Sequence, residues 1–217
     1  MAPLDPRLPP ADAFYFIAYE ATRRRRSGSR VVRIGLGAAV LGELVMAGGL
    51  AVDGGGRVHV RQRALPDPLL RDVLDLMVMQ PQHRELSVWM AFLAEEAEDW
   101  IVRRLRQQRL VHDVVERRLI GSVRVTVPAD ANEAAWESLR LERLLNTRTP
   151  MVLADSFLTG LVAATGLINH VLWNPETSVV GRAVVPDVIA ALPPELLAVV
   201  RQCEAAVGQT VLAPRPA

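Results

Sequence analysis

The sequence predicts a mainly α-helical fold, a globular helical bundle around one buried apolar helix with one or two short β-hairpins. Half of the 217 residues are apolar but only 5% are aromatic. Leu, Val and Ala must therefore fill the core, and this composition favours helix over strand. Apolar residues also recur at helical spacing, in segments that Gly and Pro residues separate. We expect an extended Pro-rich tail at residues 1–10 and a single helical domain at residues 11–210.

The first half of the chain is expected to hold helices and one glycine-turned hairpin. The first helix is apolar enough to be buried, with Asp12 as its cap. A stripe of Leu and Val predicts the second helix, which Gly48 ends in a left-handed conformation. A glycine run between two short strands predicts the hairpin. In order, these elements are the helices Ala11–Ala21 and Ile34–Gly48, the strands Leu50–Val52 and Arg57–Val60, and the helices Leu69–Met79 and His83–Arg109.

The second half is expected to open with another hairpin and to continue as helices. Asp130 and Glu133 have the spacing of a helix cap and its partner three residues on. Residues Met151–Leu172 are apolar almost all round, so we expect them to form the most buried helix of the fold. In order, the elements are the strands Leu110–Val115 and Leu119–Val127, a helix from Asp130 to Leu145, the helix Met151–Leu172, and closing helices at Val184–Ile189 and Pro193–Val207.

The charge balance and the cysteine count exclude several classes of protein. The formal net charge is +1, so binding to an anionic partner would need a local patch. The chain contains Arg but no Lys. The single Cys203 excludes an internal disulfide and a Cys-based zinc site. The start of the chain lacks the pattern of a secretory signal, and no apolar run is long enough to span a membrane. We expect a cytoplasmic protein whose membrane contact, if any, is peripheral.

No sequence motif in the chain indicates a catalytic site. The four histidines, His59, His83, His112 and His170, are far apart and lack the spacing of metal ligands. The acidic run from Glu95 to Asp99 is expected to form an exposed face that Arg103 and Arg104 pair with, rather than an acid–base pair. The glycine-containing segments lack the rest of a nucleotide-binding fingerprint. We therefore predict no catalytic residue, no metal site and no cofactor.

A basic segment is the first candidate site. Six cations fall within eleven residues, immediately before and within the start of the second expected helix. Guanidinium groups pair with phosphate oxygens in a bidentate manner, which suits a lipid headgroup. A solvated loop is the alternative interpretation. The candidate lipid- or phosphate-binding residues are Arg23, Arg24, Arg25, Arg26, Arg30 and Arg33.

The turn of the second hairpin is the other candidate site. Arg117, Arg118, Leu119 and Ile120 place two cations beside two aliphatic side chains. An isolated two-stranded hairpin is marginally stable in water, so something should cover it. A membrane interface or a second copy of the chain, bound through residues 110–127, would do so. Alternatively, the hairpin folds back and hides Leu119 and Ile120 in its own domain.

One segment resembles a known family. Residues Gly35–Leu50 read Gly-Leu-Gly-Ala-Ala-Val-Leu-Gly-Glu-Leu-Val-Met-Ala-Gly-Gly-Leu. This is similar to the Gly-Leu-x-x-x-x-Leu-x-Glu-Leu-x-x-x-Gly-x-Leu segment of the GPP34 family (Golgi phosphoprotein 3-like). The chain looks like a bacterial, actinomycete member of that family. Weaker similarity lies at Trp100–Val111 and Arg143–Leu172.

The resemblance implies a helical globule with a projecting β-hairpin and, from the eukaryotic members, peripheral membrane binding through a phosphoinositide. The family's phosphate-binding residues do not carry over. Gly37 stands where the family has an arginine, its tryptophan falls near Gly28, and its two helix arginines fall near Glu95 and Glu98. In this chain the basic segment would have to replace that pocket.

The leading hypothesis is therefore a peripheral protein that binds anionic lipid headgroups, or a partner on the inner face of the membrane. A small-molecule binder or enzyme with a pocket beside residues 151–172 is one alternative. A winged-helix regulator is another, in which residues 34–48 would enter a DNA groove and residues 53–57 would form the wing. That helix lacks Arg, Lys, Asn and Gln side chains with which to read bases, so we expect no nucleic-acid partner.

Overall fold

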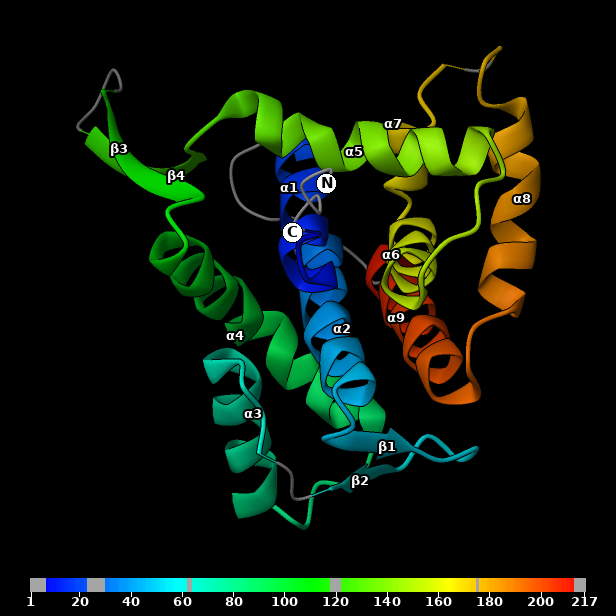
Figure 1. Ribbon diagram of the computed structural model, residues 1–217. Helices are drawn as coiled ribbons and strands as arrows, with labels where there is room; N and C mark the ends of the chain where they lie inside the picture. Colours follow the sequence, from blue (N-terminus) through cyan, green and yellow to red (C-terminus); the bar gives the residue numbers. More distant parts are fainter. Residues whose placement is uncertain (1–6, 23–29, 62–63, 118–121, 175, 213–217) are drawn as a thin grey trace, which may run out of the picture.

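The computed structural model describes residues 7–22, 30–61, 64–117, 122–174 and 176–212 (Figure 1). Within these ranges the chain is mainly α-helical, with two small antiparallel sheets of two strands each, as the sequence predicts. In order, the elements are α1 Pro10–Thr22, α2 Arg30–Met46, β1 Leu50–Val52, β2 Val58–Val60, α3 Pro68–Met79, α4 Leu86–Gln107, β3 Val111–Arg117, β4 Ser122–Pro128, α5 Ala131–Asn146, α6 Leu153–Ala164, α7 Ile168–Val171, α8 Val179–Ala190 and α9 Pro194–Leu212.

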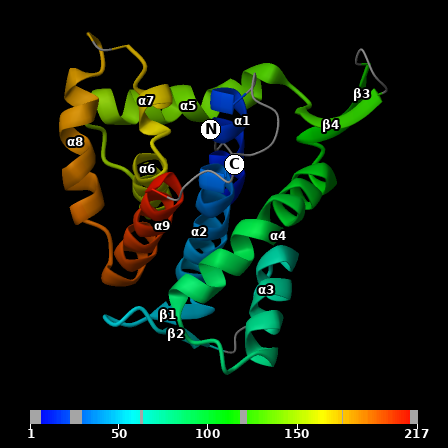
Figure 2. The ribbon, with the colours of Figure 1, turned by 180° about the vertical axis from the view of Figure 1, so that it is seen from behind.

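Helix α2 runs through the centre of the bundle, with α1, α4, α6 and α9 packed around it (Figures 1 and 2). Glycines let these neighbours approach closely. A Cβ on Gly35 would lie 2.2 Å from the ring of Phe14 in α1, and a Cβ on Gly42 would lie 2.0 Å from the ring of Phe157 in α6. The sequence of α2 thus leaves room for the aromatic side chains that fill the core.

The prediction of one long, most buried helix at Met151–Leu172 is wrong. This segment is two helices, α6 and the short α7, separated where Gly166 takes a left-handed backbone with φ of 73°. Seven of the twelve residues of α6 are buried, compared with twelve of the seventeen of α2. The uniform apolar pattern predicted burial, but it could not show that a glycine interrupts the helix.

Most other boundaries agree with the prediction to within a few residues. Gly48 has the left-handed conformation expected after α2, with φ of 73°, and Asp130 caps α5 by accepting a hydrogen bond from the Asn132 backbone N–H at 2.7 Å. Two helices begin at least four residues earlier than predicted. Helix α2 starts at Arg30 rather than Ile34, which places Arg30 and Arg33 on a helix, and α8 starts at Val179 rather than Val184.

Asp12 does not cap α1, contrary to the prediction, but belongs to a buried ion cluster. Its Oδ1 accepts hydrogen bonds from Arg104 of α4 at 2.7 and 3.0 Å. Arg104 also donates to Glu43 of α2 at 2.9 Å and to Asp67, the cap of α3, at 3.2 Å. The cluster of Arg104, Asp12, Glu43 and Asp67 therefore ties four segments together. Arg104 was expected on an exposed face, and it is buried because its carboxylate partners come from distant segments.

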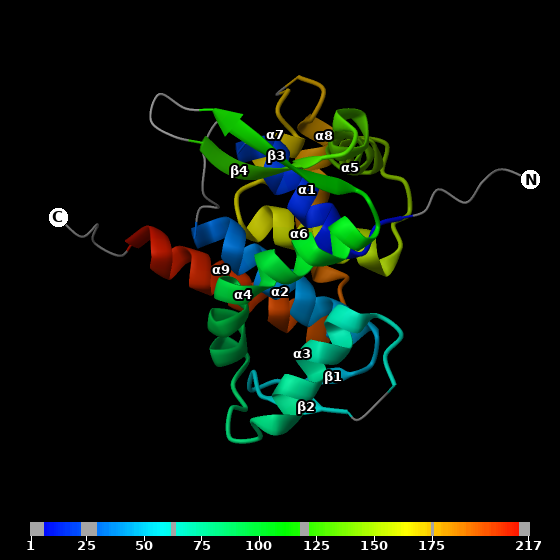
Figure 3. The same ribbon diagram turned by 90° about the vertical axis from the view of Figure 1, so that its left-hand side faces the viewer.

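The two hairpins lie at opposite ends of the molecule (Figure 3). Strands β1 and β2 pair beside α3, whereas β3 and β4 pair over seven residues beyond the end of α4. The β3–β4 hairpin stands away from the helices in Figures 1 and 2 and contacts them at its base. Within the described residues, no single helix is long and apolar enough to cross a membrane. Helices α8 and α9 meet the criterion of length and composition only as a pair, which is bent by 120°.

Candidate functional site

The basic segment divides between described and undescribed residues. Arg23, Arg24, Arg25 and Arg26 lie outside the described residues. Arg30 is exposed at the first position of α2. Arg33, one turn later, forms an ion pair with Glu95 of α4, and 32% of its side chain is exposed. The structure therefore leaves Arg30 open to solvent and engages Arg33 with an acidic partner.

The surface formed by Arg30, Arg33, Glu95 and Glu98, called here the α2–α4 surface, is mixed in charge. Burial raises the pKa of Glu98, the nearby Asp99 raises it further, and Arg33 partly offsets both effects. The prediction that Arg103 and Arg104 pair with this acidic run is wrong for Arg104, which points into the buried ion cluster. Carboxylates beside Arg33 would repel a phosphate, so this surface has no anion-binding pocket of the kind that a cluster of arginines would form.

Close packing at Gly37 also leaves no room for the arginine that the family resemblance places at this position. A Cβ on Gly37 would lie 2.9 Å from the backbone nitrogen of Ala94 in α4. Such a separation is too short for two non-bonded atoms, so α2 and α4 would have to move apart to admit any side chain. The helix pair is therefore built for contact rather than for a pocket at this point.

A small pocket of about 220 Å³ lies next to this surface, between α2, α4 and α9. Its wall is apolar where Ile34 and Met90 line it, and its rim carries Arg30 and Glu95. The two charges on the rim have opposite signs, so they do not give the pocket a preference for anionic ligands. Its other lining residues are Ser87, Ala91, Ala94, Gln202, Ala206, Gln209 and Thr210.

The β3–β4 hairpin carries the other candidate residues. Arg117 is exposed at the end of β3, whereas Arg118, Leu119 and Ile120 lie outside the described residues. The pairing of the strands places Arg117, Val115 and Arg124 on one face. Val115 is 65% exposed. A solvent-exposed aliphatic side chain therefore lies between two arginines.

Polar contacts hold the base of the hairpin. Arg106 of α4 donates a hydrogen bond to Asp113 at 2.7 Å and another to Thr126 at 3.1 Å. Thr126 in turn donates to Asp113 at 2.9 Å. The hydrogen bond from Arg106, supported by that from Thr126, lowers the pKa of Asp113. The base is thus fixed to α4, while the outer half of the hairpin extends into solvent.

The opposite face of the hairpin carries Val114, Val123 and Val125, and Val123 is 36% exposed. Sequence reasoning missed Val115, Val123 and Arg124 because it placed the turn too early and assigned residues from 119 onward to the second strand. The alternation Val-Arg-Val-Thr-Val at 123–127 was the available signal, since successive strand residues face opposite sides.

Two sequence alternatives can be compared with the structure directly. Helix α2, which a winged-helix protein would insert into DNA, is the central buried helix, so it has no free face to insert. Three pockets lined by described residues border α2, β1, β2, α3, α4 and α9, and none of these three is lined by α6. Among the described residues, no group of three His, Cys, Asp or Glu side chains could hold a metal ion.

A family model described as Golgi phosphoprotein 3 (GPP34) matches residues 11–203, which is most of the chain. No curated protein is significantly similar to the sequence.

Proposed function

The chain belongs to the Golgi phosphoprotein 3 (GPP34) family, and from this premise we propose that it is a peripheral protein that binds anionic lipid surfaces. The contacts in this proposal are the β3–β4 hairpin and the arginines at the α1–α2 connection. Binding at the inner face of the membrane, from the cytoplasm, is part of the proposal. Self-association through the hairpin is the alternative use of the same surface.

The observation that carries the proposal is the composition of the projecting hairpin. Val115 is exposed between Arg117 and Arg124, on a hairpin that projects away from the bundle of helices (Figure 1). At a bilayer interface, guanidinium groups can reach the lipid phosphates while aliphatic side chains enter just below them. Each cation near an anionic surface contributes about 1 kcal/mol.

The α2–α4 surface argues for recognition of charge rather than of one headgroup. Gly37 is packed against Ala94, and Glu95 and Glu98 carry carboxylates where a phosphate-binding site would need cations. We therefore expect vesicles of equal surface charge to bind equally well, whether the charge comes from phosphatidylglycerol or from phosphatidylinositol 4-phosphate.

Co-sedimentation with vesicles tests the proposal. Wild-type protein should sediment with phosphatidylcholine vesicles that contain phosphatidylglycerol, and binding should weaken as salt is added, because salt screens exposed charges. The double variant Arg117→Ala, Arg124→Ala should bind less well. Its matched control is Arg71→Ala, Arg201→Ala, which removes two exposed arginines from α3 and α9. Equal loss in both double variants would show that only net charge matters and would refute the role of the hairpin.

Two further variants test the basic segment and the hairpin turn separately. Substitution of the four arginines Arg23 to Arg26 by Ala should weaken vesicle binding and reduce its dependence on salt. Unchanged vesicle binding would show that these arginines do not contact the membrane. The change Leu119→Ser, Ile120→Ser should reduce vesicle binding without lowering the melting temperature. If it instead abolishes self-association in analytical ultracentrifugation and leaves vesicle binding intact, the hairpin is a contact between copies of the chain.

A further inference from the structure

Strand β2 has an open edge at Val60. Pairing between β1 and β2 places Ala51 opposite His59, and the bond from the Arg61 N–H to the Gly49 carbonyl shows which residues of β2 face β1. Val58 and Val60 therefore direct their backbone groups to the outer edge. The Val58 N–H donates there to the Arg84 carbonyl at 2.7 Å. The backbone groups of Val60 have no partner within the described residues.

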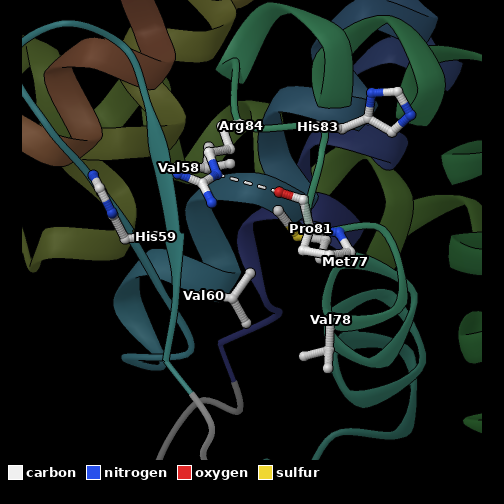
Figure 4. A pocket seen from close by; sticks show the side chains of 8 residues that line it. All are labelled: Val58, His59, Val60, Met77, Val78, Pro81, His83 and Arg84. Atoms are coloured by element: carbon white, nitrogen blue, oxygen red, sulfur yellow. Dashed lines mark hydrogen bonds between the residues drawn. The ribbon is translucent and has the colours of Figure 1, made fainter.

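A cavity of about 410 Å³ adjoins this open edge (Figure 4). Its walls are apolar: Val60 points into it from β2, Val78 points into it from α3, and Met77 and Pro81 close the side between them. Val78 is 41% exposed, so an apolar occupant would cover a side chain that now faces water. His59 and His83 also border the cavity, but their rings are turned away from its centre.

Arg84 places a positive charge at one end of the cavity. Its Nε donates to the Pro81 carbonyl at 3.2 Å, the bond drawn in Figure 4. The neighbouring Glu85 pairs with Arg57 instead, at 3.5 Å. Arg84 forms no ion pair with any described carboxylate, so its terminal nitrogens are available to an anionic group. A carboxylate is a planar anion that can bind a guanidinium through two parallel hydrogen bonds.

The direction of the neighbouring segment fixes which end of a ligand would meet Arg84. Residues 84–86 run antiparallel to β2, with the Leu86 N–H donating to the Gly56 carbonyl at 2.9 Å. A chain that added at Val60 in the same antiparallel sense would run toward Arg84. Its carboxyl end, rather than its amino end, would therefore reach the guanidinium.

We propose that the β2 edge, the apolar cavity and Arg84 form a binding site for the carboxyl terminus of an extended peptide. The peptide backbone pairs with the N–H and carbonyl of Val60, its last apolar side chain enters the cavity between Val60 and Val78, and its terminal carboxylate binds Arg84. Addition of a peptide strand to a sheet edge and capture of a terminal carboxylate are both common modes of peptide recognition. This site is separate from the proposed lipid contacts and does not depend on them.

Binding of short fluorescent peptides to the full chain tests the carboxylate. The probes are Gly-Ser-Val-Thr-Val-Xaa peptides that end in Val, Leu or Phe, each made with a free carboxylate and as the amide. At least one free acid should bind with a dissociation constant below about 1 mM, and its amide should bind at least about tenfold more weakly. Arg84→Gln should weaken binding of the free acid by the same factor and leave binding of the amide unchanged. The matched control Arg71→Gln, which also removes a bond from an arginine to a proline carbonyl, should change neither.

A second pair of variants tests the strand edge. Val60→Pro removes the outward N–H, and proline is tolerated where the N–H of an edge strand faces solvent. It should abolish peptide binding while the melting temperature stays near that of wild type, and Val60→Thr, which keeps the N–H, should still bind. The proposal is overturned if no probe binds, if acid and amide bind equally, or if Val60→Pro binds as well as Val60→Thr. The proposal is also overturned if laurate binds and none of the peptides does, since a fatty acid needs no strand edge.

Discussion

Replacing Arg104 is the most direct test of how the core is held together. Arg104→Gln keeps a long side chain at the position but removes the only cation of the buried ion cluster. Burial alone would lower the pKa of Arg104, but the charges and hydrogen bonds of Glu43 and Asp12 outweigh it and raise that pKa above its usual value. The variant leaves Asp12 and Glu43, which are 0% and 5% exposed, without their guanidinium.

The size of the effect follows from the geometry. Arg104 donates two hydrogen bonds to Asp12, two to Glu43 and one to Asp67. Removing one partner of a buried ion pair costs about 3–5 kcal/mol, because the other charge stays buried. For a protein of this length, 1 kcal/mol corresponds to a shift of about 2–4 °C, so we expect the melting temperature to fall by about 6–20 °C.

Urea and thermal unfolding followed by circular dichroism measure this change. Arg103→Gln is the matched control, since Arg103 is the exposed neighbour of Arg104 on the same helix, and it should alter stability by less than about 0.5 kcal/mol. The loss in Arg104→Gln should also shrink as the pH falls through about 7, the pKa of Asp12 in the folded protein, because a neutral carboxyl group leaves no unpaired buried charge. A melting temperature within about 2 °C of the control at pH 8 would refute the reasoning.

Three further outcomes follow from the same packing. Burial raises the folded-state pKa of Asp12 from 3.8 to about 7 against the opposing effect of Arg104, so its contribution to stability is complete below pH 3.8 and is lost as pH rises to about 7. Asp12→Asn should remove this pH dependence of the free energy of unfolding, measured by urea titration at several pH values. Parallel pH profiles for wild type and variant would contradict the prediction. Leu161→Ala, at a fully buried position, should cost about 2–5 kcal/mol in the same assay. Gly37→Ala should destabilise despite the better helix propensity of alanine, whereas Gly208→Ala in α9, with open space around it, should not.

Local sequence signals predicted the elements well where the deciding residues are close together in the chain. Gly48 ends α2 and Asp130 caps α5 because a backbone conformation and a side-chain hydrogen bond depend on a few adjacent residues. The glycine turn likewise predicted the strands β1 and β2. The same reasoning failed at Gly166, where a single glycine divides an apolar segment whose composition looks uniform.

Long-range pairing explains the rest of the differences. Arg104 follows four acidic residues on α4 and looks like part of an exposed face, yet its partners Asp12 and Glu43 precede it by 92 and 61 residues. Arg33 likewise looked free for a ligand, but it pairs with Glu95, 62 residues away. The hairpin was predicted as an interaction element from its turn, and its exposed Val115 and Val123 became apparent only with the strand register.

The glycines of α2 also bear on how the protein is made. Each glycine in a helix interior costs about 1 kcal/mol relative to alanine, so a free α2 would be mostly unfolded. Helices α1 and α4 supply part of its packing, but α6 and α9 are synthesised much later, since α6 begins at Leu153, 107 residues after α2 ends at Met46. At the usual rates of translation, that interval is roughly 5–20 s. During this time the face of α2 that packs on α6 and α9 is exposed on the nascent chain, where a holding chaperone would be most needed.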